Sequence, residues 1–334
     1  MDKKEVLKIF AYGGNLRNSI DKISKAGRGG LFIFIDYKKI KKICSGGFEI
    51  NDNLSGEKLA ELAKMDGAII IDDKFEKVLF ANVLLTPDVK IPTNETGTRH
   101  QTAERTAKQF ETLVLAVSER TKVATIYYKN KKVQLSSLNE LFTKTGEALK
   151  SLEKHEDIFH ELIKKFDVSE ILELVTLEDI VLLFQRKKII DIVADILSMF
   201  LAELGKEGKL IQLQLKESVN FSDRETNLMI KDYEDYFDFS KILSELDELQ
   251  YDDVLDKENL FKIFMNNRKN ENALIPKGFR ILRNIPVLSI EDIDLIVSKF
   301  PTLKELMISN EEDLLKKGIS ERKAKSIKEY LLKF

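Results

Sequence analysis

The chain has 334 residues, of which 43% are hydrophobic and 33% charged, and its net charge at pH 7 is -2. This length predicts two or three domains, and this amount of apolar sequence excludes a wholly disordered chain. The near balance of charge excludes a uniformly basic protein that binds nucleic acid over its whole surface.

The cysteine and histidine content excludes several classes of site. A single cysteine, Cys44, forms no internal disulfide, so a reducing compartment is expected. The three histidines, His100, His155 and His160, form no zinc-binding pattern. The first residues, "MDKKEVLKIF", lack a signal-peptide core, and no stretch approaches the ~20 apolar residues that span a membrane. We expect a cytoplasmic protein that does not contact a membrane.

Residues 1–145 alternate short apolar runs with segments of helical composition. Strands are predicted over 29–36, 67–72, 77–85 and 113–119, where β-branched and aromatic residues gather. A hairpin is predicted over 122–135 with "KNKK" as its turn, and helices are predicted within 55–65 and 102–113. This alternation predicts an α/β domain in which helices flank a central mixed β-sheet.

Residues 146–275 change to an all-helical pattern, with apolar side chains at helical spacing and almost no glycine. Examples are Ile189, Val193, Ile196, Phe200 and Leu204. Ser222 and Glu225 have the spacing of a capping box, which predicts a helix start there. We interpret this part as a helical spacer whose apolar stripes serve packing.

Residues 276–334 are predicted to form a small all-helical domain. Its twelve Lys and Arg against nine Asp and Glu give it a charge of +3. Several of the basic residues surround a glycine in "KKGISERKAKSI". A charge run is usually a solvated face, but cations around a glycine turn also suit a phosphate contact.

The segment "GTRHQTAERTAKQ", residues 97–109, places many polar groups where a helix is predicted to begin. Thr98 and Gln101 fit a capping box, so capping alone is one explanation. Capping does not require Arg99 and His100 between them, however. A helix N-terminus already favours an anion, and these side chains add a guanidinium and an imidazole. The alternative explanation is a polyphosphate site.

A second candidate is Asp66, which precedes Gly67 in "KMDGAIIID". Aspartate is common in turns, which is the structural explanation. As a carboxylate at a strand end it also suits Mg²⁺ or Mn²⁺. A carboxylate on one loop and a basic helix start on another are the minimal parts of a nucleotidyl-transfer site.

These motifs resemble a known family. The strings "LAKMDGAIIIDD", "LFANVLLTPDVKIPTNETGTRHQTAERTAKQ" and "LAVSERTKVATIYY" resemble the diadenylate cyclase domain of the DNA integrity scanning protein family. The resemblance continues through "AELGKEGKLIQLQL" and into the tail, which looks like that family's helix-hairpin-helix DNA-binding module. It implies three domains: a cyclase domain over 1–145, a linker over 146–275 and a helix-hairpin-helix domain over 276–334.

The resemblance implies an enzyme that joins two ATP molecules into cyclic di-AMP and releases two pyrophosphates, with Mg²⁺ or Mn²⁺ as cofactor. Asp66 would bind the metal and help to activate the ribose 3′-hydroxyl, with Arg99 and His100 as the other catalytic residues. The ATP-binding residues would be Gly67, Leu85 (through its backbone, at adenine), Thr98, Arg99, His100, Gln101, Thr102 and Ser118. Two domains must face each other, so a homo-oligomer is implied, in this family an octamer.

The DNA-binding residues implied for the tail are Lys316, Lys317, Gly318, Ile319, Ser320, Arg322 and Lys323, and branched DNA is the expected partner. Two departures from the family pattern matter. Gln101 stands where the family usually has arginine, and Ser320 stands at the second glycine of the hairpin's Gly-apolar-Gly pattern. The alternative hypothesis is therefore a scaffold that binds ATP or DNA and whose cyclase site is weakened or inactive at Gln101.

Overall fold

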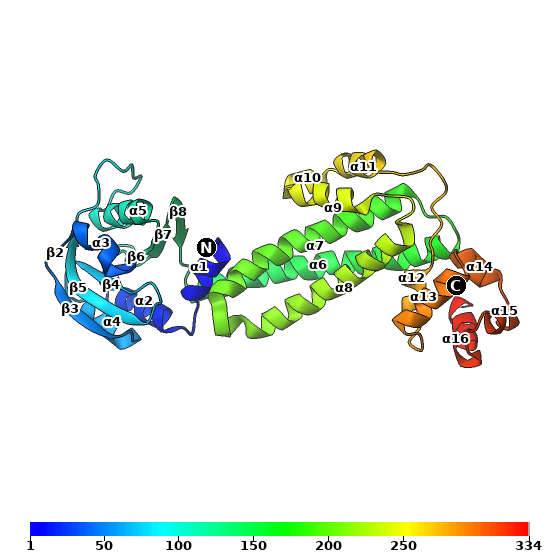
Figure 1. Cartoon of the computed structure of the whole chain (residues 1–334), viewed down its shortest axis with the longest axis horizontal. Helices are drawn as coiled ribbons and strands as arrows, with labels where there is room; N and C mark the ends of the chain where they lie inside the picture. Colours follow the sequence, from blue (N-terminus) through cyan, green and yellow to red (C-terminus); the bar gives the residue numbers. More distant parts are fainter. Residues whose placement is uncertain (333–334) are drawn as a thin grey trace. The chain divides into compact units, whose positions relative to one another are not determined.

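The structure of the protein is a computed structural model that describes residues 1–332, and the chain divides into two compact units (Figure 1). Unit 1 comprises residues 1–146 and 198–212, and unit 2 comprises 147–197 and the chain from Leu213 onward. The predicted boundary at 145 lies next to the first unit boundary. The predicted spacer and tail lie together in unit 2, except that the turn region 198–212 belongs to unit 1.

Unit 1 is built on an eight-stranded mixed sheet, as the sequence predicts. The strands are β1 (Gly30–Phe34), β2 (Cys44–Ser45), β3 (Phe48–Asn53), β4 (Ala68–Ile71), β5 (Lys77–Leu85), β6 (Leu113–Val117), β7 (Ala124–Tyr128) and β8 (Lys131–Gln134). Their order is β2-β5-β4-β1-β6-β7-β8, with β3 also pairing with β5. Strands β1 and β4 are parallel, and the other pairs are antiparallel.

Each predicted strand and the predicted hairpin are confirmed. The hairpin pairs Tyr128 with Lys131, so its turn is only Lys129 and Asn130; the predicted four-residue turn is wrong, because Lys131 and Lys132 belong to β8. Strands β2 and β3 were not predicted. Strand β2 has only two residues, and β3, "FEINDN", is exposed and polar, so neither carries the apolar alternation of a half-buried strand.

Helices cover both faces of the sheet, because successive strand residues point to opposite sides. One face packs against α1 (Lys3–Ile9), α2 (Asn15–Lys25) and α4 (Gly56–Leu62); Phe32 and Phe34 of β1 point there. The other face packs against α3 (Tyr37–Ile40) and α5 (Thr98–Phe110), toward which Leu31 and Ile33 point. The predicted helices at 55–65 and 102–113 correspond to α4 and α5.

Unit 2 is helical throughout. Its long helices are α6 (Leu138–Ile171), α7 (Leu177–Leu204) and α8 (Lys209–Tyr233), which begin or end in unit 1, and its shorter ones are α9 (Phe239–Glu248), α10 (Tyr251–Leu255) and α11 (Lys257–Asn266). The predicted capping box at Ser222 and Glu225 is wrong, because both residues lie inside α8. There Ser222 is buried and donates to the carbonyl of Val219. A capping motif inside a continuous amphipathic segment does not start a helix.

The tail contains α12 (Phe279–Arg283), α13 (Ile290–Lys299), α14 (Leu303–Ile308), α15 (Glu311–Lys316) and α16 (Glu321–Leu331) around one apolar core. Arg280 of α12 is fully buried and forms ion pairs with Asp167 and Glu170 of α6. The Asp232 carboxylate, also fully buried, accepts the backbone N–H groups of residues 278–280. Buried charges of this kind make the tail and the long helices one packing unit.

Among residues 1–332, none of the helices combines the length and the apolarity needed to cross a membrane.

Candidate active site

The pairing of β1 with β4 places Asp66 next to Gly29, at the edge of the sheet where both strands begin. The parallel register of β1 and β4 pairs Phe32 with Ile69. Continued back by three residues, it places Gly29 beside Asp66. Asp66 itself is exposed, and no hydrogen bond or ion pair within residues 1–332 involves its carboxylate. The acidic group therefore lies at the sheet edge free to take a ligand.

Two further predicted residues reach the same edge. The antiparallel register of β1 and β6 pairs Gly30 with Val117, which makes Ser118 the neighbour of Gly29 on the other side. Leu85 ends β5, and β5 runs opposite to β4, so its end lies beside the start of β4. The side chain of Leu85 is buried in the core, which leaves only its backbone for a ligand.

Gly67 has a structural reason to be glycine. Its φ of +95° is in the left-handed region, and a Cβ there would lie 2.9–3.0 Å from backbone atoms of Asn82 and Val83. The close approach to β5 fixes where Asp66 projects. Gly67 as a nucleotide contact remains a prediction.

Helix α5 begins at Thr98 with Gly97 as its N-cap, and no side chain caps it. The predicted capping box is therefore wrong, because Thr98 already lies within the helix. The Gln101 amide instead donates to the backbone carbonyl of Glu95, at 2.7 Å. The first-turn N–H groups are left without a side-chain cap, and such groups attract an anion.

The guanidinium of Arg99 lies directly against the backbone of Gly29. A Cβ placed on Gly29 would lie 2.5 Å from Cζ of Arg99, closer than any real contact. Gly29 is thus glycine because Arg99 occupies the space of a side chain. This contact places a cation over Gly29, whose neighbours in the two strand registers are Asp66 and Ser118.

A cavity of about 440 Å³ opens between the start of α5, the loop after β6 and the hairpin β7–β8. It brings together four predicted residues, Thr98, Arg99, His100 and Ser118. Its lining does not include Asp66, Gly67, Leu85, Gln101 or Thr102. The volume suits a nucleotide-sized ligand.

The cavity also contains charged residues that sequence reasoning missed, namely Glu95, Glu119, Arg120 and Lys132. Arg120 and Lys132 are exposed cations, but the carboxylates of Glu95 and Glu119 balance their charge, so Arg99 supplies the net positive charge of the cavity. Arg120 lies in a polar loop and Lys132 in the exposed strand β8, and only the fold shows that both reach the start of α5.

His100 is held by a series of polar contacts. Its Nδ1 lies 2.8 Å from the hydroxyl of Tyr127, and the hydroxyl is also hydrogen-bonded to Glu95. Glu95 in turn forms an ion pair with Lys132 at 2.5 Å. Burial, and then the charges of Lys132 and Arg99, hold the pKa of His100 below its ordinary value against the opposing Glu95 carboxylate.

The pKa values of Glu95 and Tyr127 determine which of the two donates the hydrogen bond between them. Burial acts to raise the pKa of Glu95, but the hydrogen bonds from Lys132 and Tyr127 hold it below its ordinary value. Burial and then the Glu95 carboxylate raise the pKa of Tyr127. At neutral pH the carboxylate is ionised and the phenol keeps its proton.

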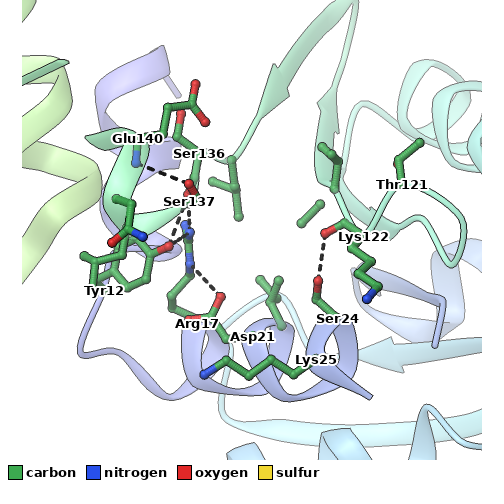
Figure 2. A pocket seen from close by; sticks show the side chains of 16 residues that line it. Tyr12, Arg17, Asp21, Ser24, Lys25, Thr121, Lys122, Ser136, Ser137 and Glu140 are labelled. Carbon is green, nitrogen blue, oxygen red and sulfur yellow. Dashed lines mark hydrogen bonds and ion pairs between the residues drawn. The ribbon is translucent and has the colours of Figure 1, made fainter. Parts of the chain in front are cut away.

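A larger cavity, of about 580 Å³, is shown in Figure 2 and shares Thr121 and Val123 with the first. Its buried cation, Arg17, already pairs with Asp21 and Glu203 and with the hydroxyl of Tyr12. A guanidinium committed in this way is not available to a phosphate. The smaller cavity is therefore the better candidate.

The donor set for a metal is sparse. Among residues 1–332, no group of three or more His, Cys, Asp or Glu side chains is arranged around a common point. Mg²⁺, however, is commonly held by one or two carboxylates together with substrate phosphates and water. A single unpaired carboxylate such as Asp66 fits a metal that arrives with a nucleotide, and does not fit a metal bound by protein alone.

In the tail, Gly318 adopts a left-handed φ of +87° between α15 and α16. Its N–H and that of Ile319 donate to the carbonyls of Leu315 and Leu314, so neither is available to a phosphate. Ser320 is the N-cap of α16 and makes no side-chain capping bond. The N–H groups suited to a phosphate are thus those of the first turn of α16.

The predicted DNA-binding cations differ in availability. Lys316 and Arg322 are exposed. Lys323 forms an ion pair with Asp292 at 2.6 Å, and Lys317 lies over the ring of Phe300, 3.8 Å from its centroid. Ile319 is buried in the tail core.

Comparison with known proteins agrees with this organisation. Residues 17–132 match the DAC family model, "DisA bacterial checkpoint controller nucleotide-binding", and residues 135–273 match the DisA-linker model, "DisA bacterial checkpoint controller linker region". The chain is 36% identical to the DNA integrity scanning protein DisA of Clostridium kluyveri, over 97% of this chain and 93% of that protein. It is 36% identical to that of Bacillus subtilis, over 99% and 93%.

Among solved structures, DacA from Staphylococcus aureus is similar to 41% of this chain and 91% of that chain, at 23% identity and a TM-score of 0.31. The full-length relatives, together with the two family models, determine the family. The chain belongs to the DNA integrity scanning protein DisA family, and its N-terminal part is a nucleotide-binding domain of the diadenylate cyclase type.

Proposed function

We propose that the chain is a diadenylate cyclase that condenses two ATP molecules into cyclic di-AMP and two pyrophosphates. The observation that carries this proposal is the contact of Arg99 with Gly29, the residue that the strand register places between Asp66 and Ser118. Nucleotidyl transfer needs a carboxylate and a cation at one place, and no stretch of sequence brings these two together.

In the proposed reaction each ribose 3′-hydroxyl attacks the α-phosphorus of the other ATP. A new O–P bond forms, the hydroxyl gives up its proton with Asp66 as the proposed acceptor, and the bond to pyrophosphate breaks. Arg99, the uncapped start of α5 and the cavity cation Arg120 would hold the triphosphate and stabilise the charge that develops on it. Asp66 would hold Mg²⁺ or Mn²⁺, which supplies charge neutralisation at the phosphates when bound.

Two copies of the domain are required, because one candidate cavity holds one nucleotide and both bonds must form. A homo-oligomer is therefore part of the proposal, with the octamer as the expected assembly. Thr98, Thr102 and Gln101 would lie toward the phosphates and the Leu85 backbone toward adenine.

The tail is proposed to bind DNA through backbone phosphates. Lys316, Arg322 and the free first-turn N–H groups of α16 support this, and such contacts position a protein without reading bases. Several tails on one oligomer would favour DNA with several arms, such as a branched junction.

The test of the cyclase proposal is incubation of the purified protein with ATP and Mn²⁺, with products read by mass. A cyclic di-AMP peak supports the enzyme. ATP that binds without conversion supports the alternative, a scaffold with an inactive site at Gln101. Asp66→Asn is nearly isosteric but uncharged and should abolish synthesis without unfolding the protein; an active variant would remove Asp66 from the mechanism.

A further inference from the structure

The hydrogen bonds around Tyr127 determine which nitrogen of His100 carries a proton. A tyrosine hydroxyl has one hydrogen to donate, and an ionised carboxylate can only accept. Glu95 is ionised because it pairs with Lys132 at 2.5 Å. The Tyr127 hydrogen therefore goes to Glu95.

This assignment also determines the direction of the hydrogen bond between the Tyr127 hydroxyl and His100. The Tyr127 oxygen, 2.8 Å from Nδ1 of His100, has no second hydrogen and must accept. Nδ1 of His100 is then the donor and carries a proton in both charge states of the ring. The reverse arrangement would set the Tyr127 oxygen against the Glu95 carboxylate with no hydrogen between them.

We infer that Tyr127, Glu95 and Lys132 are positioning residues that fix His100 as its Nδ1–H tautomer, so that Nε2 is the only ring nitrogen able to exchange a proton or accept a hydrogen bond in the cavity. The role of this tautomer in catalysis rests on the proposed function. The assignment of the tautomer does not. His100 meets a ligand as a neutral acceptor at neutral pH, not as a fixed cation.

Burial supports a fixed arrangement. Tyr127 is 1% exposed and Glu95 is 17% exposed at its side chain, so water cannot readily replace either partner. The charged groups facing His100 are Glu95 from the preceding loop, Arg99 from its own helix and Lys132 from β8. The two cations outnumber the one carboxylate, which agrees with a ring that is neutral at pH 7.

The chain suits a direct measurement, because it has only three histidines. Full-length protein labelled with ¹³C and ¹⁵N only at histidine would be sedimented and studied by magic-angle-spinning NMR at pH 7.5, without nucleotide. His155→Gln and His160→Gln assign the signals. We expect His100 to show a protonated Nδ1 and an unprotonated Nε2; an Nε2–H tautomer in the wild-type protein would overturn the inference.

Tyr127→Phe keeps the buried ring and removes the hydroxyl. It should abolish the exclusive Nδ1–H tautomer and lower kcat by about 10- to 100-fold with a smaller change in KM, as is typical when the partner that orients a histidine is lost. Tyr128→Phe, on the opposite face of β7, is the matched control and should change neither.

The experiments can contradict the cyclase proposal and the positioning inference independently of each other. A wild-type protein that shows the Nδ1–H tautomer but forms no cyclic di-AMP would contradict the proposed function alone. An active enzyme whose His100 signal is the same in Tyr127→Phe as in the wild type would contradict the positioning inference alone.

Discussion

Replacing Gly29 with alanine should reduce activity without reducing stability. The added Cβ would lie 2.5 Å from Cζ of Arg99, and the three nearest atoms all belong to that guanidinium. An ordinary carbon contact is about 3.5–4.0 Å, so the guanidinium must move by about 1 Å. A displacement of this size at a reacting centre can cost on the order of 10²-fold in rate.

The fold should tolerate the change, because the Arg99 side chain is flexible and Gly29 does not adopt a left-handed φ. Alanine at such a position stabilises by roughly 0.4–1 kcal/mol through the unfolded state. We expect an unchanged or slightly higher Tm by calorimetry and a roughly 100-fold lower rate of cyclic di-AMP formation. Gly146→Ala, which meets nothing within 4 Å, is the matched control and should keep full activity.

A double-mutant cycle makes the test specific to the contact. If Gly29→Ala acts by displacing Arg99, it should add little to the loss caused by Arg99→Ala, because the two substitutions share one mechanism. Fully additive losses, or a Gly29→Ala variant that retains wild-type turnover, would refute the reasoning that this contact places the catalytic cation.

Four other outcomes are expected. Gln101→Arg should tighten ATP binding by calorimetry, since it adds a cation at the phosphates; no gain would mean that the hydrogen bond to the Glu95 carbonyl is the function of this residue. Arg280→Met should lower the free energy of unfolding in urea by about 3–5 kcal/mol, because it leaves buried carboxylates unpaired, and a loss below about 1 kcal/mol would contradict that. Burial raises the pKa of Glu170 to about 7 from 4.5, so folding takes up a proton in this window and Tm should fall as pH rises from 5 to 7.5; the slope should flatten in Glu170→Gln, and an unchanged slope would exclude this group. Arg322→Glu should weaken binding to a branched DNA in a gel shift, and the wild-type affinity should fall with salt at a log–log slope of about -0.9 per phosphate; Lys262→Glu, an exposed residue of the spacer, should bind like the wild type.

The structure argues for point variants in preference to removal of the tail. Truncation before Pro276 would take Arg280 away from Asp167 and Glu170, and would leave Asp232 without the N–H groups it accepts. A truncated chain that fails to bind DNA would then report on the packing of unit 2 as much as on DNA contacts.

Much of the sheet was predictable because its central strands are continuous apolar runs. The β-branched and aromatic residues of β1, β4 and β6 are buried on both faces, and hydrophobicity alone finds such strands. Strand β3 has no such pattern and was missed. The capping boxes at Thr98 and Ser222 were wrong for a related reason: a four-residue motif does not specify where a helix begins when the surrounding sequence sets its limits.

The candidate site was predictable only in its separate parts. Arg99, His100 and Asp66 stand out by residue type next to a helix start or a strand. The requirement for glycine at Gly29 and the role of Tyr127 depend on which strands are neighbours, and this information lies in the register. Tyr127 in particular reads as an ordinary core residue of a strand until its hydroxyl is seen between Glu95 and His100.

The most direct test of the central claim uses an equal mixture of unlabelled ATP and ATP labelled with ¹⁵N in adenine. The wild-type protein with Mn²⁺ should give cyclic di-AMP in three masses, unlabelled, half-labelled and fully labelled, with the half-labelled product the most abundant because two ATP molecules are joined at random. A protein that binds both forms of ATP but returns them unchanged, or that yields only mononucleotide products, would contradict the account.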